Sequence, residues 1–252
     1  MIRPMRITIA QYSLSGCEGC ALRLLNIITS NEKLIDHIEL VSSRVMGIPE
    51  VRQADVAFVD GSVLRDNEEE FLMEIRSKSR ILVALGTCSI MGGLNALREL
   101  YTVAELEEQV YGMKLNIGHL DSAKPLDSIV KVDYIIPGCP PPTWEIEEFL
   151  LCLLLGKEFR LTDRTVCFEC TSQGLPCLLE RGEVCFGPVI RGGCNAICPK
   201  YGIPCWGCRG IVEEYGMERL IENLRKHNVS PERVKEYIRI FLLKTKLRTL
   251  MR

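Results

Sequence analysis

The sequence is poor in aromatic residues and in long hydrophobic runs. Phe, Trp and Tyr make up 6% of the 252 residues, and no basic stripe with interleaved aromatics is present, which argues against nucleic acid as a partner. No window approaches the ~18 apolar residues of a membrane span, and the run Phe149–Leu155 is too short. Neither an apolar leader nor a paired-arginine signal precedes the first strand pattern. We therefore expect a cytoplasmic protein.

Cysteine is the residue present in excess. The chain has 13 cysteines, 47% hydrophobic residues and a formal net charge of −2. A secreted disulfide scaffold with this many cysteines is normally much shorter and lacks a large aliphatic core. In a reducing cytoplasm, clustered cysteines are more often metal thiolates than disulfides. The composition therefore predicts metal sites rather than a disulfide framework.

The first part of the chain alternates short aliphatic strands with helices. Buried parallel strands separated by helices predict a doubly wound α/β sheet. Binding sites in such sheets form just beyond the carboxyl ends of the strands. The expected strands are Arg6–Gln11, Ile38–Val41, Val56–Val59, Ile81–Leu85 and Val132–Ile136, and the expected helices are Ala21–Thr29, Asn67–Arg76 and Thr143–Leu155.

Four cysteines follow these expected strands. Cys17 and Cys20 lie in the turn after the first strand, and Cys88 and Cys139 come directly after two later strands. Each lies near glycine or proline, and glycine lets backbone N–H groups approach sulfur. Cysteines packed as small hydrophobic residues are one alternative, and zinc is another. Four thiols meeting at one sheet edge favour an iron–sulfur site over both.

A second region holds eight cysteines between positions 167 and 208. Eight thiols suit two sites of four cysteines each. The pairs Cys167-x₂-Cys170 and Cys205-x₂-Cys208 have the spacing of zinc knuckles, so spacing favours iron–sulfur clusters over zinc only slightly. Cys152 stands apart in an apolar helical stretch and is interpreted as a core residue.

The C-terminal segment predicts two helices. Ile211–Lys226 has an amphipathic pattern, and Asn228-Val229 breaks it. Ser230-Pro231 then provides a helix N-cap with proline at the first helical position. The second helix, expected over Glu232–Leu247, has one apolar face and a basic end. We expect the pair to cover the cysteine region; a helix lying on a membrane surface is the less favoured interpretation.

Six segments occur in a fixed order and spacing: SGCEGC, DGSV, GTCSIMGG, PGCPPP, CFGP and CNAICPK…PCWGC. Through these segments the sequence resembles the small, electron-transferring subunit of nickel–iron hydrogenases over nearly its whole length. A related subunit of respiratory complex I shares only the first part and lacks the eight later cysteines. The resemblance implies a flavodoxin-like domain over residues 1–161, a loop-rich iron–sulfur domain over 162–210 and C-terminal helices over 211–252.

The same resemblance implies three [4Fe–4S] clusters. Cys17, Cys20, Cys88 and Cys139 match the ligands of the cluster proximal to the nickel–iron centre; Cys194, Cys198, Cys205 and Cys208 match the medial set; Cys167, Cys170, Cys177 and Cys185 match the distal set. Membrane-bound and periplasmic relatives have histidine where this chain has Cys167, and their medial site often lacks the counterpart of Cys198. Both departures match the cytoplasmic branch of the family.

The implied partners are a large subunit, which carries the nickel–iron centre, and a flavin- and iron–sulfur-containing acceptor subunit. The chain is most similar to sulfhydrogenase small subunits, which couple hydrogen to NAD(P)(H). Delivery of electrons to heterodisulfide reductase or to a deazaflavin coenzyme is the alternative, as is a non-hydrogenase iron–sulfur carrier. Asp60 replaces the glutamate of many relatives. Glu18 could relay protons, face the large subunit or simply face solvent, and Arg191 and Arg209 flank cysteines, where they could compensate thiolate charge or form surface salt bridges.

Overall fold

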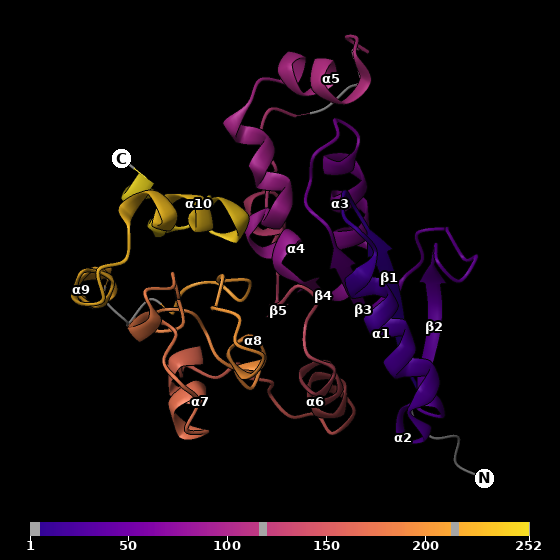
Figure 1. The fold of residues 1–252 in the computed structure, drawn as a ribbon. Helices are drawn as coiled ribbons and strands as arrows, with labels where there is room; N and C mark the ends of the chain where they lie inside the picture. Colours follow the sequence, from indigo (N-terminus) through magenta and orange to yellow (C-terminus); the bar gives the residue numbers. More distant parts are fainter. Residues whose placement is uncertain (1–5, 116–119, 213–216, 252) are drawn as a thin grey trace. The chain divides into compact units, whose positions relative to one another are not determined.

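The computed structural model describes residues 6–115, 120–212 and 217–251. Its contacts divide the chain into two units, Met1–Phe159 and Arg160–Arg252. Figure 1 labels their helices and strands. Each unit has a hydrophobic core, so each is described on its own.

The first unit is built around a parallel five-stranded sheet with the order β2-β1-β3-β4-β5 (Figure 1). Neighbouring strands are paired in parallel throughout. The predicted parallel α/β arrangement is therefore confirmed, although the strand ends differ from the predicted ones. The strands are β1 (Ile7–Ser13), β2 (Ile38–Ser43), β3 (Ala54–Asp60), β4 (Ser79–Leu85) and β5 (Tyr134–Ile136).

Helices connect these strands, and the three predicted ones are present. The unit contains α1 (Gly19–Ser30), α2 (Glu32–Ile35), α3 (Glu68–Ser77), α4 (Thr87–Met91), α5 (Val103–Tyr111) and α6 (Thr143–Leu154), with 3₁₀ turns η1 (Gly93–Leu100) and η2 (Leu126–Ser128). The elements α4, η1 and α5 lie between β4 and β5, where the sequence had predicted none.

Both faces of the sheet are covered. On β3, Ala57 and Val59 share one core with Leu72 of α3. Side chains alternate along a strand, so Phe58 points to the other face, where its ring lies 5.6 Å from that of Phe149 on α6. Burying a side chain as large as Phe58 contributes about 1.5–3 kcal/mol. These contacts hold the strands rigidly, and with them the loops at their carboxyl ends.

The second unit consists of short helices joined by cysteine-bearing loops. Its elements are α7 (Val166–Ser172), η3 (Leu179–Arg181), α8 (Ile197–Lys200), α9 (Met217–Lys226), α10 (Pro231–Phe241) and η4 (Lys246–Met251). Phe186 and Ile190 from the loops share one core with Leu220 of α9 and Ile238 of α10. The C-terminal helices thus pack against the cysteine loops.

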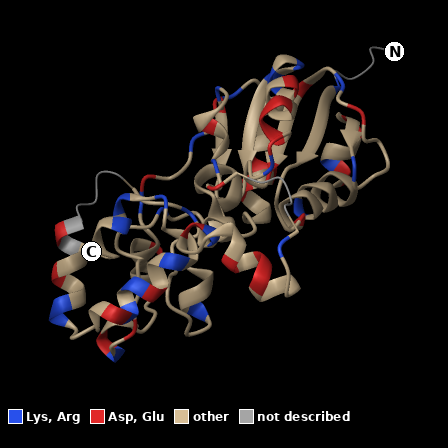
Figure 2. Ribbon diagram, turned by 90° about the horizontal axis from the view of Figure 1, so that it is seen from above, with Lys and Arg blue, Asp and Glu red and all other residues tan. Residues whose placement is uncertain are grey.

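Lys and Arg are interspersed with Asp and Glu along the described ribbon (Figure 2).

The predicted bounds of the C-terminal helices are wrong at two points. Ile211 forms an isolated bridge with Ile190, and α9 begins at Met217; residues 213–216 lie outside the described part. The helix α10 ends at Phe241, because Leu242 already has non-helical backbone angles. The predicted cap is confirmed, since the Ser230 hydroxyl accepts a hydrogen bond from the Arg233 N–H. Across the described residues, no helix combines the length and apolar content needed to cross a membrane.

Candidate metal centres

The first group of cysteines lies at the carboxyl end of the parallel sheet. Cys17 and Cys20 flank the start of α1, which follows β1. Cys88 lies in α4 directly after β4, and Cys139 follows β5. Cys17 and Cys139 are exposed, whereas Cys20 and Cys88 are half-buried. Three separate loops therefore present four thiols at one edge.

Backbone hydrogen bonds hold these loops together. The Gly86 N–H donates to the Ile136 carbonyl at 2.8 Å, and the Thr87 N–H donates to the Gly138 carbonyl at 3.0 Å. The Leu14 N–H likewise donates to the Asp60 carbonyl at 2.9 Å. These hydrogen bonds tie the segments next to Cys17, Cys88 and Cys139 to the sheet.

Gly86 forms a wall of this group. Its φ angle is +89°, a conformation that side-chain-bearing residues rarely adopt. A Cβ atom at this position would collide with the Sγ of Cys20. The backbone therefore comes as close to the sulfur as it can, which leaves the other side of Cys20 for a bound group.

The thiols of this group influence one another electrostatically. Burial, followed by the negative charge of Asp60 and of the other three cysteines, raises the pKa of Cys20 far above the ordinary thiol value. Burial and the neighbouring Cys139 and Cys17 raise the pKa of Cys88 to about 11. Such thiols stay protonated on their own. A bound metal reverses this, because a coordinating thiol loses its proton outright.

Asp60 lies at the end of β3 beneath these thiols. Its side chain is buried, and the Oδ1 atom has no hydrogen-bond partner within the described part of the chain. Burial raises the pKa of Asp60 to about 6; the neighbouring Ser13 hydroxyl opposes the rise, and the charge of Glu18 adds to it. The single hydroxyl proton of Ser13 is donated to the Glu18 carboxylate at 2.6 Å. Glu18, half-buried with φ +62°, therefore belongs to this polar group and does not simply face solvent.

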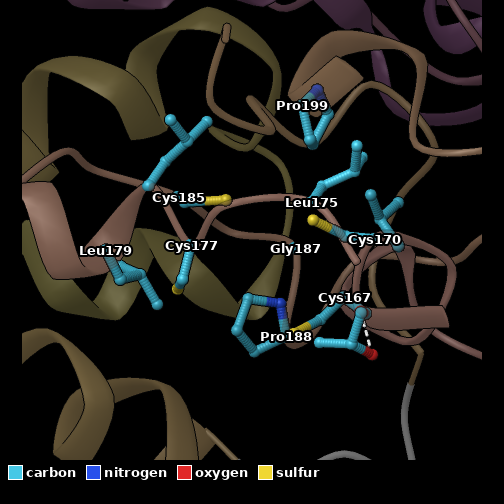
Figure 3. Close-up of a pocket in the computed structure, with 12 residues that line it drawn as sticks. Cys167, Cys170, Leu175, Cys177, Leu179, Cys185, Gly187, Pro188 and Pro199 are labelled. Carbon is cyan, nitrogen blue, oxygen red and sulfur yellow. Dashed lines mark hydrogen bonds between the residues drawn. The ribbon is translucent and has the colours of Figure 1, made fainter. Parts of the chain in front are cut away.

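The second group surrounds a cavity of about 50 Å³ in the second unit. Cys167 and Cys170 come from α7, whereas Cys177 and Cys185 come from the loops on either side of η3. Figure 3 shows the sulfur atoms of Cys170 and Cys185 pointing toward one another across this space. Burial, then the charges of Cys185, Cys170 and Cys177, raises the pKa of Cys167 to about 11. The rest of the lining is mostly apolar, from Val166, Leu175, Leu178, Leu179, Pro188 and Pro199.

The third group is less tightly assembled. Burial, together with the charges of Cys185, Cys208 and Cys194, raises the pKa of the fully buried Cys205. Cys198 lies on α8 and is exposed, and its charge acts on Cys185 of the second group. The structure thus brings Cys194, Cys205 and Cys208 together. Cys198 interacts with Cys185 of the second group instead, and its place among the medial ligands stays a prediction.

A hydrogen bond joins the second and third groups. The N–H of Cys205 donates to the Sγ of Cys185 at 3.4 Å. Pro199, next to Cys198, lines the cavity of the second group. The two groups are therefore immediate neighbours.

Charged residues around the third group differ in their roles. Arg191 is half-buried, donates to the Thr162 carbonyl at 2.7 Å and pairs with the exposed Asp163 at 3.0 Å. Arg209 is buried, donates from Nε to the Gly192 carbonyl at 2.7 Å and lowers the pKa of Cys194 against the effect of burial. Glu169, between Cys167 and Cys170, also acts on Cys194, a role that sequence reasoning missed. The only sequence signal was its position between two candidate ligands.

The donor chemistry fits iron–sulfur clusters. Eleven of the thirteen cysteines fall into the three groups, and Cys198 acts on Cys185 of the second group. No disulfide joins any of these cysteines in the described part of the chain. Cys152 lies apart on α6. Within residues 6–115, 120–212 and 217–251, no three Cys, His, Asp or Glu side chains are grouped tightly enough to bind a single metal ion. Cysteine thiolates are the ligands that hold iron–sulfur clusters in proteins. Here they surround a cavity in the second unit and lie against the backbone of Gly86 in the first.

Comparison with known proteins identifies the family. Residues 17–153, more than half of the chain, match the model of the NADH ubiquinone oxidoreductase 20 kDa subunit. The chain is 33% identical to a subunit of the F420-non-reducing hydrogenase of Methanococcus voltae, over 83% of this chain and 84% of that protein. It is 35% identical to the delta subunit of sulfhydrogenase 2 of Pyrococcus furiosus, over 85% of this chain and 91% of that protein.

A solved structure supports membership of the same protein family. The chain is 34% identical, with a TM-score of 0.57, to a chain in the crystal structure of an NAD⁺-reducing [NiFe]-hydrogenase in its H₂-reduced state. The match covers 96% of that chain but 62% of this one. The first unit alone, Met1–Phe159, makes up a similar share of the present chain.

Proposed function

We propose that this chain, which belongs to the small-subunit family of nickel–iron hydrogenases, relays electrons through three [4Fe–4S] clusters. As a member of that family it is part of an oxidoreductase complex and has a large subunit as partner. The observation that carries the proposal is the distribution of its cysteines, eleven of which lie in three groups, with Cys198 acting on Cys185. The sheet order β2-β1-β3-β4-β5 supports a flavodoxin-like first domain.

Each group would hold one cluster. Cys17, Cys20, Cys88 and Cys139 would hold the proximal one; Cys194, Cys198, Cys205 and Cys208 the medial one; Cys167, Cys170, Cys177 and Cys185 the distal one. When bound, a cluster of this type supplies a site that accepts and releases a single electron. The chain's own residues fix the positions of the sulfurs, exclude water from them and set the surrounding charge.

The leading candidate for the acceptor is a flavin-containing partner that reacts with NAD(P)(H). The likeness to the NAD⁺-reducing enzyme supports it, and so does the likeness to the sulfhydrogenase subunit. The match to the NAD⁺-reducing enzyme covers no more of the chain than the first unit would, which leaves room for a different acceptor at the second.

Heterodisulfide reductase is the second candidate. Several relatives that match more than four-fifths of this chain are named F420-non-reducing hydrogenases. Those names exclude the deazaflavin coenzyme F420 as the acceptor of these relatives. The same names favour an acceptor other than F420 for this chain too, and that acceptor would receive electrons from the second unit.

The experiment uses the complex of this chain with its large subunit, purified without oxygen. Under H₂ we expect the visible absorbance of the clusters to bleach and a dye to be reduced. In Cys139→Ser, hydrogen–deuterium exchange by the large subunit should persist while dye reduction falls by at least tenfold. Equal dye reduction in both proteins would contradict the relay.

A second experiment distinguishes the acceptors. It compares H₂-dependent reduction of NAD⁺ or NADP⁺ with H₂-dependent reduction of a heterodisulfide by added reductase.

A further inference from the structure

Glu169 lies on the helix of one cysteine group and binds the loop of another. It stands in α7 between Cys167 and Cys170, which line the cavity of the second group. Its carboxylate nevertheless accepts hydrogen bonds from the Gly193 N–H at 2.5 Å and the Ala196 N–H at 2.9 Å. These two N–H groups flank Cys194. The carboxylate therefore bridges α7 and the loop that carries a ligand of the third group.

The Glu169 carboxylate lies close to the backbone of this loop and to the sulfur of Cys194. A Cβ atom on Gly192 would lie 3.0 Å from the Glu169 Oε1, so glycine allows the carboxylate to approach the backbone. The Oε2 atom lies 3.9 Å from the Sγ of Cys194. Glu169 thus places a negative charge next to a ligand sulfur, and this charge adds to the effect of burial in raising the pKa of Cys194.

The loop needs such a support. Asn195 and Ala196 have φ angles of +57° and +47°, a left-handed conformation that costs energy for residues with a side chain. Gln173, one turn after Glu169, donates to the Oδ1 of Asn195 at 2.9 Å. Neighbouring positions on one face of α7 thus hold the strained part of the loop.

The loop is held from the other side by positive charge. The buried guanidinium of Arg209 donates to the Gly192 carbonyl and acts on Cys194 in the opposite direction to Glu169. The charge beside the sulfur is therefore a balance between these two residues. Removing either one would change the field at the site of which Cys194 is part.

We propose that Glu169 is a positioning residue for the medial site, which holds the Cys194 loop and lowers the reduction potential of the cluster there. The inference rests on the proposed function, because it requires clusters in the second unit. A negative charge opposes the arrival of an electron. The carboxylate also occupies two N–H groups that could otherwise bind cluster sulfur, and net charge and such hydrogen bonds both set the potential.

The test is Glu169→Gln in the complete, anaerobically purified complex. Glutamine keeps the size and one acceptor oxygen but removes the charge. We expect iron and sulfide to be unchanged and one of the three midpoint potentials, followed by EPR during a redox titration, to rise. At a fixed potential, the ratio of reduced to oxidised cluster should increase about tenfold, which is 59 mV for a one-electron couple.

Two matched variants serve as controls. Gln173→Ala loosens the same loop without changing its charge, and Glu222→Gln removes a carboxylate from the exposed surface of α9. Neither should raise a midpoint potential. A rise in Gln173→Ala equal to that in Glu169→Gln would show that loop position, not charge, is responsible, and would overturn the proposal. Full iron content with all three potentials unchanged in Glu169→Gln would do the same.

A further variant covers loss of the cluster. If Glu169→Gln loses about a third of its iron, the iron content of Glu169→Asp tests the role of the charge, because aspartate keeps the charge on a shorter side chain. Retention of iron in Glu169→Asp supports the proposal, whereas equal loss shows that a retained negative charge does not hold the loop and contradicts it. Wild-type protein without iron in the second unit would contradict the proposed function itself, which distinguishes the two failures.

Discussion

At the scale of residues, neighbouring charges and the ligand atoms together set what each cysteine group can do. The negative charge of Asp60 acts on Cys20, and that of Glu18 acts on Asp60, whereas the opposite charges of Glu169 and Arg209 act on Cys194. At Cys167, burial and the neighbouring cysteines raise the thiol pKa. The identity of the ligand itself is therefore the clearest means of changing the potential at the distal site.

Cys167→His should raise the potential of the distal cluster. Imidazole ligation raises potentials in another class of iron–sulfur cluster, because a neutral ligand replaces an anionic thiolate. The measurement is an EPR-monitored redox titration of the variant complex against wild type, with iron content as the check on occupancy. A distal potential that is unchanged or lower, with iron retained, would contradict this expectation.

The grouping of cysteines could be predicted from the sequence in part. Cys88 and Cys139 follow aliphatic strands directly, and parallel strands end at a common edge. In the second unit, spacing alone left zinc open, and only the resemblance to a family assigned sets of ligands. Glu169 could not be predicted in its role, because its contact with Gly193 depends on how a loop folds back onto α7. The same holds for the Cys205 N–H bound to Cys185.

At the scale of elements, prediction succeeded where hydrophobic pattern and packing agree. The helices α1, α3 and α6 each have an apolar face that a sheet or another helix covers. The end of α10 was misplaced because the apolar pattern continues beyond it, into η4, where Leu247 is also buried. Periodicity reports which residues are buried and not where a helix stops.

Asp133 joins three elements of the first unit. Its carboxylate accepts from the Leu82 N–H of β4 at 2.9 Å and pairs with Arg76 of α3 at 2.5 Å. Although burial opposes it, the bonds from Leu82 and Arg76 lower the pKa of Asp133. A lowered pKa contributes stability that is present above the ordinary carboxyl pKa and is lost as pH falls through the folded-state value.

Asp133→Asn should therefore lower the free energy of unfolding at neutral pH by about 1–3 kcal/mol, and the difference from wild type should shrink as the pH falls below about 4. Thermal unfolding of anaerobic protein across this pH range measures both effects. Asp127→Asn, at an exposed position of η2, is the matched control and should change little. A destabilisation of Asp133→Asn that stays constant with pH would contradict the role of the charge.

At the scale of the whole molecule, the two units carry different sets of cysteines. The first carries Cys17, Cys20, Cys88 and Cys139 at the edge of the parallel sheet. The second carries the eight cysteines from Cys167 to Cys208 on α7, α8 and the connecting loops, against which α9 and α10 pack. The account therefore requires that both units bind iron, and in a ratio of one to two.

The measurement that tests this most directly is the content of iron, acid-labile sulfide and zinc in anaerobically purified protein. The account predicts about twelve irons and about twelve sulfides per chain, as three [4Fe–4S] clusters with cysteine ligands require. Cys152→Ser should keep this content, because Cys152 lies outside the three groups. About four irons with two zinc ions would leave only the first-unit cluster and would contradict the electron relay through the second unit.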